Sequence, residues 1–551
     1  MPVLRSWMFG VGRSTFADVC IGAALLVVFL ATGCAKRESP AAEGIRTKTL
    51  LLGNGAEPQD LDPQTCTLYT DGNILMALFE GLTCIDEKTS QAVPGVAERW
   101  DVSTDGLVYT FHLRAEAKWS NGDPVTADDF VYSFHRILSP GLASEYSYML
   151  YFIKNAEAFN NGKVSDFAQV GAKALDARTL QVSLDHACPF LPAVAAHQSW
   201  FPVHRATIEK FGQMDQRGTL WTRPENFVGN GPFTFKEWSP NSRIIVAKSP
   251  SYWDAAHNHL NAVIFFPTDN IATDESAFRA DQVHLTYQLL PDRIAHYRNE
   301  APQFLRIDPF IETEYLQFNV TRPPLNDPRV RQALARAIDR VAIARNILHD
   351  SCQPANALTP PDTAGYTPEA KIPTDFEAAR KLLAEAGYPG GKNFPLLEIQ
   401  TKNDNIWRAV AEAIQEMWKR ELGIHVQIAS FEQKTWLSNS QALGYQINLY
   451  RWIGDYNDPS TFLYLFKSGS GNNNTGWANA DYDRLNNEAD HATDPATRNA
   501  LLQQAEALLL GEAPIAPVYY GTRTYLIQPN VKGWVPALLG YHRYQFIELE
   551  K

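Results

Sequence analysis

The sequence predicts an α/β protein in which helices cover the faces of β-sheets. Patterns typical of strands and of helices alternate along the whole chain, which is the order expected when helices pack on sheets. The composition is that of a globular protein, with 45% hydrophobic and 20% charged residues. A length of 551 residues is too great for one hydrophobic core and indicates two or three domains.

Short strands dominate the first half of the chain. Alternation of apolar and polar residues predicts them, because successive side chains of a strand point to opposite faces of its sheet. A helix is expected after Thr126, which forms a capping box with Asp129 ahead of an amphipathic run to Ile137. Strands are expected at residues 49–53, 109–114, 233–238 and 244–247, and a helical stretch is expected at 74–79.

The helices of the second half are longer, and several begin at a residue that caps them. Asp327 and Pro328 begin one of these helices, because Asp accepts hydrogen bonds from free N–H groups and Pro fixes φ in the first turn. Asp494 and Pro495 begin the last helix in the same way. Helices are expected at 326–338, 376–386, 406–422 and 494–510, and strands at 315–320, 424–428, 447–453 and 515–520.

One carboxylate stands at the end of an expected strand. The strand at 447–453 ends at Gly454, and the turn residues that follow lead into a new helix. Asp455 therefore lies at the end of a buried strand, between Trp452 and Tyr456. An acid in this place either caps nearby backbone N–H groups or binds the cation of a ligand, and the residues alone leave both readings open.

The chain carries no spacing typical of an enzyme or a metal site. Gly-x-Ser-x-Gly, His-Glu-x-x-His, the phosphate-binding P-loop and Cys-x-x-Cys are all absent from the sequence. A net charge of −12 repels the phosphate backbone of nucleic acids. We therefore expect no enzyme, no cofactor, no metal and no nucleic-acid partner. A secreted hydrolase with an acid pair that spacing does not reveal is the alternative of another class.

The N-terminus has the pattern of an export signal. Two arginines precede an apolar run at 19–30, which is shorter than the roughly 20 residues of a spanning helix. The small residues before Cys34 resemble a bacterial lipobox, in which the cysteine is acylated and becomes the first mature residue. We expect a lipoprotein signal peptide at 1–33 and a polar tether at 34–48, and hence lipid anchoring to the periplasmic or extracellular face of a membrane. A plain signal peptide or an uncleaved anchor is the alternative.

A series of short motifs runs in order from about residue 49 to the C-terminus. The motifs are Glu57-Pro-Gln-Asp-Leu-Asp-Pro63, Leu78-Phe-Glu-Gly-Leu82, Pro94-Gly-Val-Ala-Glu-Arg-Trp100, Thr110-Phe-His-Leu-Arg114, Lys118-Trp-Ser-Asn-Gly122, Pro124-Val-Thr-Ala-Asp-Asp-Phe-Val-Tyr-Ser133, Asn230-Gly-Pro-Phe233, Asn326-Asp-Pro-Arg-Val-Arg331, the stretch Tyr450–Phe466 and Pro517-Val-Tyr-Tyr520. In this order they resemble the oligopeptide-binding proteins of bacterial ABC importers, in family 5 of the extracellular solute-binding proteins. So many ordered matches are specific for the family and less specific for the ligand.

The resemblance implies a bilobal fold of the periplasmic-binding-protein type II, with an additional domain and a ligand cleft between the lobes. Domain I is expected to be discontinuous, at 49–79, 205–311 and 522–551. Domain II is inserted at 80–204, and domain III forms the second lobe at 312–521. A peptide is expected to lie extended between the lobes, with its backbone paired as an added strand.

The resemblance also implies roles for single residues. In this family the acid of a Trp-x-x-Asp motif holds the α-ammonium of the peptide, which assigns that role to Asp455. Trp452 and Ile453 are then expected at the edge that binds the peptide backbone. Tyr148 matches a tyrosine that contacts the peptide, with an ordinary packed ring as its alternative, and His197 matches a further contact.

The chain departs from the family where some members bind the C-terminal carboxylate of the peptide. Basic residues stand there in those members, whereas the matching positions of this chain are Leu449, Ser440 and Trp407. Arg451 and Arg322 are the candidate substitutes.

These expectations together describe a membrane-tethered receptor, expected to be a monomer, that binds a short peptide by its free N-terminus and delivers it to an ABC permease. The ligand is expected to favour the closed state by bridging both lobes. A cell-wall (murein) peptide binder and a binder of another small solute are the alternatives, because a fold does not fix its ligand.

Overall fold

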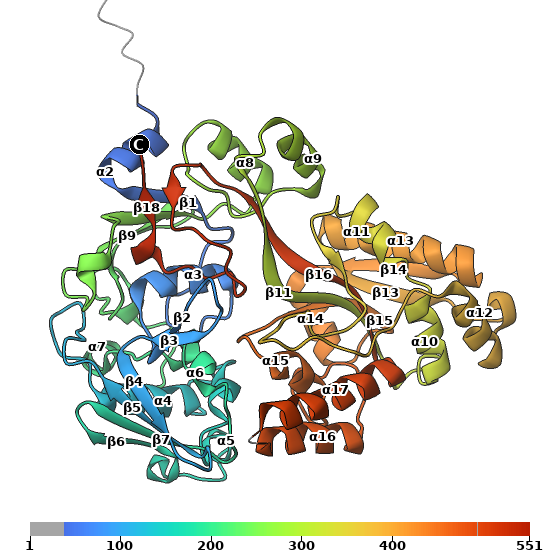
Figure 1. Ribbon diagram of the computed structural model, residues 1–551, viewed down its shortest axis with the longest axis horizontal. Coiled ribbons are helices and arrows are strands. Elements are labelled where there is room, and N and C mark those ends of the chain that lie inside the picture. Colours follow the sequence, from blue (N-terminus) through green and yellow to red (C-terminus); the bar gives the residue numbers. More distant parts are fainter. Residues whose placement is uncertain (1–37, 493) are drawn as a thin grey trace, which may run out of the picture.

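The computed structural model describes residues 38–492 and 494–551 and consists of two lobes joined by long strands (Figure 1). The expected signal peptide at 1–33 and the expected lipidation site Cys34 lie outside the described residues. Within the described ranges, no helix combines the length and the hydropathy needed to cross a membrane. The four cysteines of the same ranges, Cys66, Cys84, Cys188 and Cys352, are all free thiols.

The described part of the expected tether is folded. Pro40–Thr47 forms helix α2, which is capped by the Ser39 hydroxyl accepting from the backbone N–H of Ala42 at 3.2 Å. The ring of buried His284 holds this helix to the first lobe, with Nε2 2.9 Å from the carbonyl oxygen of Ala41. The prediction of a tether therefore does not hold for this segment, because capping and this contact order a helix of polar and small residues.

The first lobe contains two four-stranded sheets. One has the order β1-β10-β9-β8, in which β1 pairs in parallel with β10, and the other has the order β4-β5-β7-β6. Their strands are β1 (Thr49–Gly53), β4 (Ala97–Val102), β5 (Val108–Leu113), β6 (Ala172–Asp176), β7 (Thr179–Ser183), β8 (Phe233–Ser239), β9 (Arg243–Lys248) and β10 (Ala262–Phe266). The expected strands at 49–53, 109–114, 233–238 and 244–247 are thereby confirmed to within one or two residues.

Helices and two small two-stranded sheets, β2-β3 and β17-β18, complete this lobe. The expected capping box is present at the start of α4, where the backbone N–H of Thr126 donates to Asp129 at 2.8 Å. The remaining elements are α3 (Tyr69–Leu78), α4 (Ala127–Leu138), α5 (Ala156–Asn160), α6 (Leu191–Val194), α7 (Arg205–Phe211), α8 (Ile271–Arg279), α9 (Pro291–Glu300), β2 (Thr83–Ile85), β3 (Ala92–Pro94), β17 (Val531–Lys532) and β18 (Glu548–Leu549).

The second lobe is built on one six-stranded sheet with the order β12-β16-β11-β15-β13-β14. Its strands are β11 (Leu305–Phe318), β12 (Gln353–Pro354), β13 (Leu397–Lys402), β14 (Val426–Phe431), β15 (Ile447–Ile453) and β16 (Ile515–Leu526). Its helices are α10 (Pro328–Arg336), α11 (Arg340–Asn346), α12 (Phe376–Glu385), α13 (Asn405–Leu422), α14 (Gln433–Gln441), α15 (Ser460–Leu463), α16 (Ala480–His491) and α17 (Pro495–Glu512). The long helices begin where their caps predicted, with Asp327 and Asp494 as N-caps.

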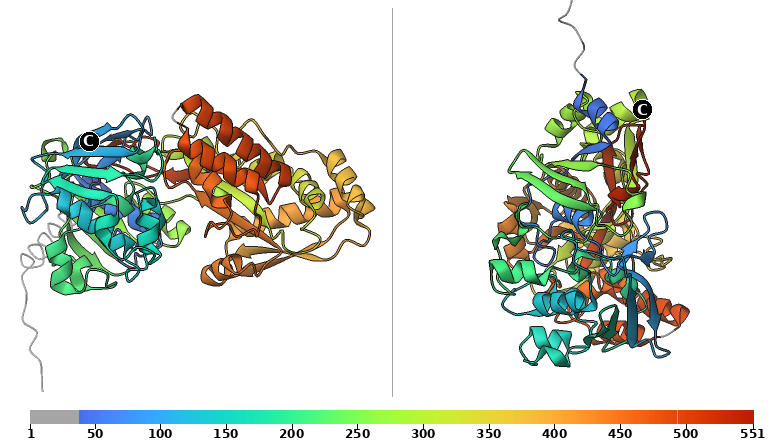
Figure 2. Two further views of the ribbon diagram at one scale, coloured as in Figure 1. Left: turned by 90° about the horizontal axis from the view of Figure 1, so that it is seen from below. Right: turned by 90° about the vertical axis from the view of Figure 1, so that its left-hand side faces the viewer.

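Two strands run from one lobe into the other. β11 and β16 are much longer than the strands expected at 315–320 and 515–520, and they pair from Leu305–Leu526 to Gln317–Ile515. Both pass between the lobes in the view from below as well (Figure 2). Their register is interrupted between Pro309 and Thr313. The expected boundaries of domain III, at 312 and 521, lie inside these strands beside that interruption, and they stay a prediction.

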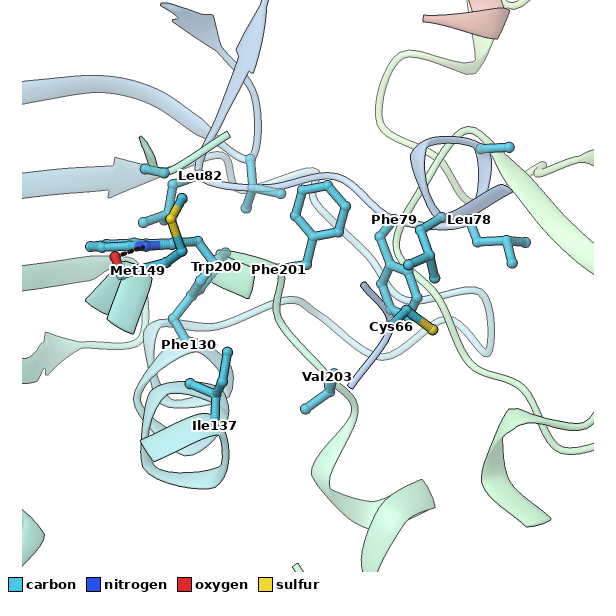
Figure 3. Close-up of a cluster of buried hydrophobic side chains, with 14 of the residues drawn as sticks. Cys66, Leu78, Phe79, Leu82, Phe130, Ile137, Met149, Trp200, Phe201 and Val203 are labelled. Carbon is cyan, nitrogen blue, oxygen red and sulfur yellow. Dashed lines mark hydrogen bonds between the residues drawn. The ribbon is translucent and has the colours of Figure 1, made fainter. Parts of the chain in front are cut away.

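The core of the first lobe fixes a loop that reaches the other lobe. Trp200 is fully buried, and its indole N–H donates to the carbonyl oxygen of Met149 at 3.0 Å. Figure 3 shows Trp200 and Met149 among the buried apolar side chains of this lobe. The position of Tyr148, which precedes Met149 in the short 3-10 helix Ser147–Leu150, is therefore set by a rigid core.

Candidate functional site

Asp455 lies directly beyond the end of β15, and its carboxylate contacts the first lobe. The backbone N–H of Asp455 donates to Thr461 at 3.0 Å, and that of Gly454 donates to the carbonyl oxygen of Ile311 at 2.8 Å, so the turn is fixed from two sides. The Tyr148 hydroxyl donates to the carboxylate at 2.8 Å. Among the described residues this is the only hydrogen bond that the carboxylate receives, so most of its accepting capacity is unused.

The environment of Asp455 opposes its charge. Burial raises the pKa of Asp455 to about 7, although the hydrogen bond from Tyr148 lowers it. Near neutral pH the group therefore gains or loses its proton readily. A cation placed beside Asp455 favours its ionised form, as expected of an acid that binds a positively charged ligand.

The structural cap of this turn is Asp458 and not Asp455. Oδ1 of Asp458 accepts from the backbone N–H of Ser460 at 2.9 Å. Both of its oxygens accept from Arg498, at 2.8 and 2.9 Å, and both side chains of this ion pair are only 7% exposed. No backbone N–H of the described chain donates to the carboxylate of Asp455. The capping alternative that the sequence left open for Asp455 therefore has no contact to support it.

The stability of the ligand-free protein should depend on the charge of Asp458 but not on the charge of Asp455. Asp458→Asn removes one partner of a buried ion pair, and we expect the free energy of unfolding to fall by about 3–5 kcal/mol. Asp455→Asn removes a carboxylate that burial already disfavours, so the ligand-free protein should keep its stability. Urea unfolding at pH 7.5 of both variants, each stripped of ligand, measures this. A loss in Asp455→Asn as large as in Asp458→Asn would make Asp455 a structural residue.

β15 has an edge without a strand partner beside Asp455. On one side it pairs with β11 over its whole length, from Ile447 to Ile453. On the other side β13 pairs only with Ile447 and Asn448 and then diverges. From Leu449 to Ile453 this second edge has no strand partner within the described ranges. Such an edge offers its backbone N–H and C=O groups to an extended chain.

Two cavities meet at Asp455. The larger, of about 270 Å³, lies between the lobes and is lined by Tyr148, Trp452 and Lys467 among others. The indole N–H of Trp452 and the hydroxyl of Tyr464, which both belong to its lining residues, are buried and have no hydrogen-bond partner in the described chain. The smaller cavity, of about 70 Å³, belongs mainly to the first lobe. A buried polar group without a hydrogen-bond partner is costly, so these two groups indicate a place where a ligand or a water molecule forms the missing hydrogen bonds.

The other expected site residues are placed differently from one another. Ile453 pairs with Glu312 in the sheet, at the open edge. His197 lies 8% exposed on the wall of the smaller cavity, and burial lowers its pKa to about 3, so its ring is neutral. The backbone N–H of Ser199 donates to Nδ1 of His197 at 3.3 Å, which leaves the proton of the neutral ring on Nε2.

Neither candidate substitute for the missing basic residues is a free cation of the cleft. Nη1 of Arg451 lies 3.4 Å from Glu312. Although burial opposes it, the carboxylates of Glu312 and Glu314 raise the pKa of Arg451. Arg322 donates to the carbonyl oxygen of Leu443, which precedes β15, and thus lies about 20 Å from Asp455 at the other end of that seven-residue strand.

Sequence reasoning missed the charged neighbours of the open edge. Glu314 lies opposite Arg451 in the sheet and accepts from the indole N–H of Trp407 at 2.9 Å. The ammonium of Lys402 lies 4.3 Å from the centre of the Trp407 ring. Burial, with the nearby carboxylate of Glu312, raises the pKa of Glu314 to about 8. These residues come from three strands and a helix, and no motif links them.

The described residues contain no group of three or more His, Cys, Asp or Glu side chains placed to hold a metal ion. The site is built around the hydrogen-bonded pair of Asp455 and Tyr148, with an open strand edge and two cavities beside it.

The comparisons with known proteins agree with this architecture. Over 500 residues the chain is 36% identical to the periplasmic oligopeptide-binding protein OppA of Escherichia coli (strain K12), covering 88% of this chain and 90% of that protein. It is 37% identical to the probable deoxycholate-binding periplasmic protein YgiS of the same strain, covering 87% and 89%. The structure of the Escherichia coli murein tripeptide binding protein MppA superposes with a TM-score of 0.81 at 33% identity, covering 91% and 98%.

These relatives share the bilobal fold of type II that the sequence motifs implied, and they are binding proteins rather than enzymes. The model of the family described as bacterial extracellular solute-binding proteins, family 5, matches residues 91–474. With a family match over most of its length and relatives similar along nearly all of it, the chain belongs to the family 5 bacterial extracellular solute-binding proteins.

Proposed function

We propose that this protein captures short peptides by their free N-terminal amine in the cleft between its lobes and delivers them to an ABC permease. The observation that carries the proposal is the Asp455 carboxylate at the end of an open strand edge, which among residues 38–492 and 494–551 accepts a hydrogen bond only from Tyr148. An ammonium group beside Asp455 supplies the missing positive charge. A peptide that runs antiparallel to β15 from that point pairs with the free groups between Leu449 and Ile453.

The placement of the site between the lobes supports capture by closure. Asp455 and Trp452 belong to the second lobe and Tyr148 to the first, so a ligand held by all three contacts both lobes. Ligand binding then favours the closed state, because only that state makes every contact. The strands β11 and β16 and their register interruption supply a connection about which the lobes close. Lipid anchoring through Cys34, a periplasmic or extracellular location and a monomeric state belong to the same proposal.

The test is a calorimetric titration of the protein after unfolding and refolding have removed any ligand acquired during expression. A mixed pool of tri- to pentapeptides is compared with the same pool N-acetylated. We expect heat from the free pool and none from the acetylated pool, because acetylation removes the ammonium charge. Equal binding of both pools would mean that the peptide is not held by its amine at Asp455. If neither pool binds, the proposal that the ligand is a peptide is wrong.

Tyr148→Phe should weaken peptide binding by about tenfold at pH 7.5. The lost hydroxyl donates to the carboxylate, and a hydrogen bond to a charged group contributes roughly 1.5–3 kcal/mol. Its removal also raises the pKa of Asp455 further, so less of the acid is ionised. Isothermal titration with a tripeptide measures the effect, and Tyr109→Phe, which removes a hydroxyl that donates to the carbonyl oxygen of Cys188 at 2.8 Å and lines neither cavity, is the control. An unchanged affinity in Tyr148→Phe would mean that the hydroxyl of Tyr148 has no role in binding and that its ring only packs against neighbouring residues.

A further inference from the structure

The guanidinium of Arg543 has no hydrogen-bond acceptor among the described residues. Its Nε is buried and without a partner, and the hydrogen bonds of this residue are made by its backbone: the N–H donates to Glu87 at 2.6 Å, and the carbonyl oxygen accepts from Phe546 at 3.0 Å. No carboxylate of the described chain forms an ion pair with it. An arginine cannot lose its charge in a protein, so the buried Nε–H without an acceptor is costly. The guanidinium carbon lies 4.6 Å from the centre of the Phe546 ring, a contact that meets its charge without accepting a hydrogen bond.

The acids nearest to Arg543 are occupied by other donors. Glu80 is 4% exposed and accepts from the Tyr252 hydroxyl at 2.5 Å and from the Trp253 indole at 2.7 Å. Glu87 accepts from His542 at 2.8 Å in addition to its bond with the backbone of Arg543. These carboxylates balance the charge of the guanidinium at a distance, but among the described residues they accept from other donors and neither accepts from the guanidinium.

Arg543 lines the same cavity as Asp455. This is the smaller of the two cavities, of about 70 Å³, which has room for roughly five to seven water molecules and thus for one side chain. Most of its wall is apolar, although Glu80 and Glu87 also line it, and the apolar residues are Met76, Phe79, Ile85, Ala193, Ala196, Phe201, Pro232, Ala537, Leu538 and Leu539. A group that enters from Asp455 therefore passes apolar surface and has an unsatisfied guanidinium on the same wall.

We propose that this cavity receives an acidic side chain on the first residue of the peptide, and that Arg543 binds its carboxylate. The inference rests on the proposed function, which places the amine of that residue at Asp455. Because Asp455 borders both cavities, the backbone can follow the open edge of β15 while the first side chain enters the smaller cavity. A glutamate-like side chain fits, because its methylene groups meet the apolar wall and its carboxylate matches the fork of a guanidinium.

The experiment titrates Glu-Ala-Ala, Gln-Ala-Ala and Ala-Ala-Ala into the ligand-stripped protein, into Arg543→Gln and into Arg205→Gln. In the unmodified protein we expect Glu-Ala-Ala to bind about tenfold to a hundredfold more tightly than the other two peptides, as a charge-assisted pair requires. Arg543→Gln should remove the difference between Glu-Ala-Ala and Ala-Ala-Ala. Arg205, which is exposed and paired with Glu209 on α7, is the matched control and should keep it.

The outcomes separate this inference from the proposed function. If Ala-Ala-Ala binds through its free amine but Glu-Ala-Ala has no advantage, the inference is wrong and the proposed function stands. Equal binding of Gln-Ala-Ala and Glu-Ala-Ala also overturns it, because the recognised group is then a neutral acceptor. A preference that survives in Arg543→Gln overturns the role of Arg543. If no peptide binds, both fail. The comparison of the three peptides in the unmodified protein does not depend on the folding of any variant.

Discussion

Asp455→Asn should weaken the binding of a free peptide by at least about a hundredfold. The amide keeps the shape of the side chain and can still accept from Tyr148, but it cannot balance a buried ammonium. Removal of one partner of a buried charge pair costs about 3–5 kcal/mol, which corresponds to a factor of about a hundred to a few thousand in affinity. Isothermal titration of a tripeptide at pH 7.5 measures this loss.

The controls show whether the loss comes from the charge or from the fold. Asp481→Asn changes an exposed acid of α16, 75% exposed, and should leave the affinity unchanged. The N-acetylated tripeptide should bind the unmodified protein about as weakly as the free one binds Asp455→Asn, since both changes delete the same pair. If Asp455→Asn binds the free peptide normally while remaining folded, the amine is held by another residue, and the assignment of Asp455 is wrong.

Local patterns sufficed to predict most of the elements around the site. The alternation at 447–453 and the Gly454 stop place β15 and Asp455 correctly, because both depend on neighbouring residues. The capping residues Asp327 and Asp494 mark the starts of their helices for the same reason. The family motifs supplied the bilobal arrangement, which no local pattern contains.

Features that depend on contacts between distant segments could not be predicted from the sequence. The open edge of β15 exists because β13, about fifty residues earlier, pairs with only two of its residues. The helix at Pro40–Thr47 is held by His284, more than two hundred residues away. Arg543 stands in no motif, and its importance comes from a buried Nε that has no hydrogen-bond partner in the part of the chain that the structure describes. Each of these features is a relation between segments that only the fold brings together.

The pH dependence of peptide binding should be bell-shaped, with its low-pH limb set by Asp455. In the ligand-free protein burial raises the pKa of Asp455 to about 7, so below that pH the acid is mostly protonated. Binding an ammonium then requires loss of that proton, and the affinity should fall about tenfold for each pH unit below 7. Above about 8 the amine of the peptide loses its own proton, and the affinity should fall again.

The raised pKa of Asp455 also makes the stability of the ligand-free protein depend on pH. The folded pKa of Asp455 lies above the ordinary value of 3.8, so between pH 4 and 7 the folded state binds more protons than the unfolded state. This group therefore makes the ligand-free protein less stable as pH rises through that window, whereas bound peptide offsets the loss by stabilising the charged form. Peptide should thus raise the melting temperature more at pH 7.5 than at pH 5.

The effect of a second acid of the larger cavity, Asp490, on the pH dependence must be distinguished from that of Asp455. Burial raises the pKa of Asp490 to about 7 as well, and this residue also lines the larger cavity. Titrations of a tripeptide at pH 5, 6, 7 and 7.5 are therefore made on the unmodified protein and on Asp490→Asn. The tenfold slope should persist in Asp490→Asn, because Asp490 lies beside Lys467 and not beside Asp455. A slope that disappears there would assign the proton to Asp490, and a flat profile in both would mean that Asp455 is already ionised before the peptide arrives.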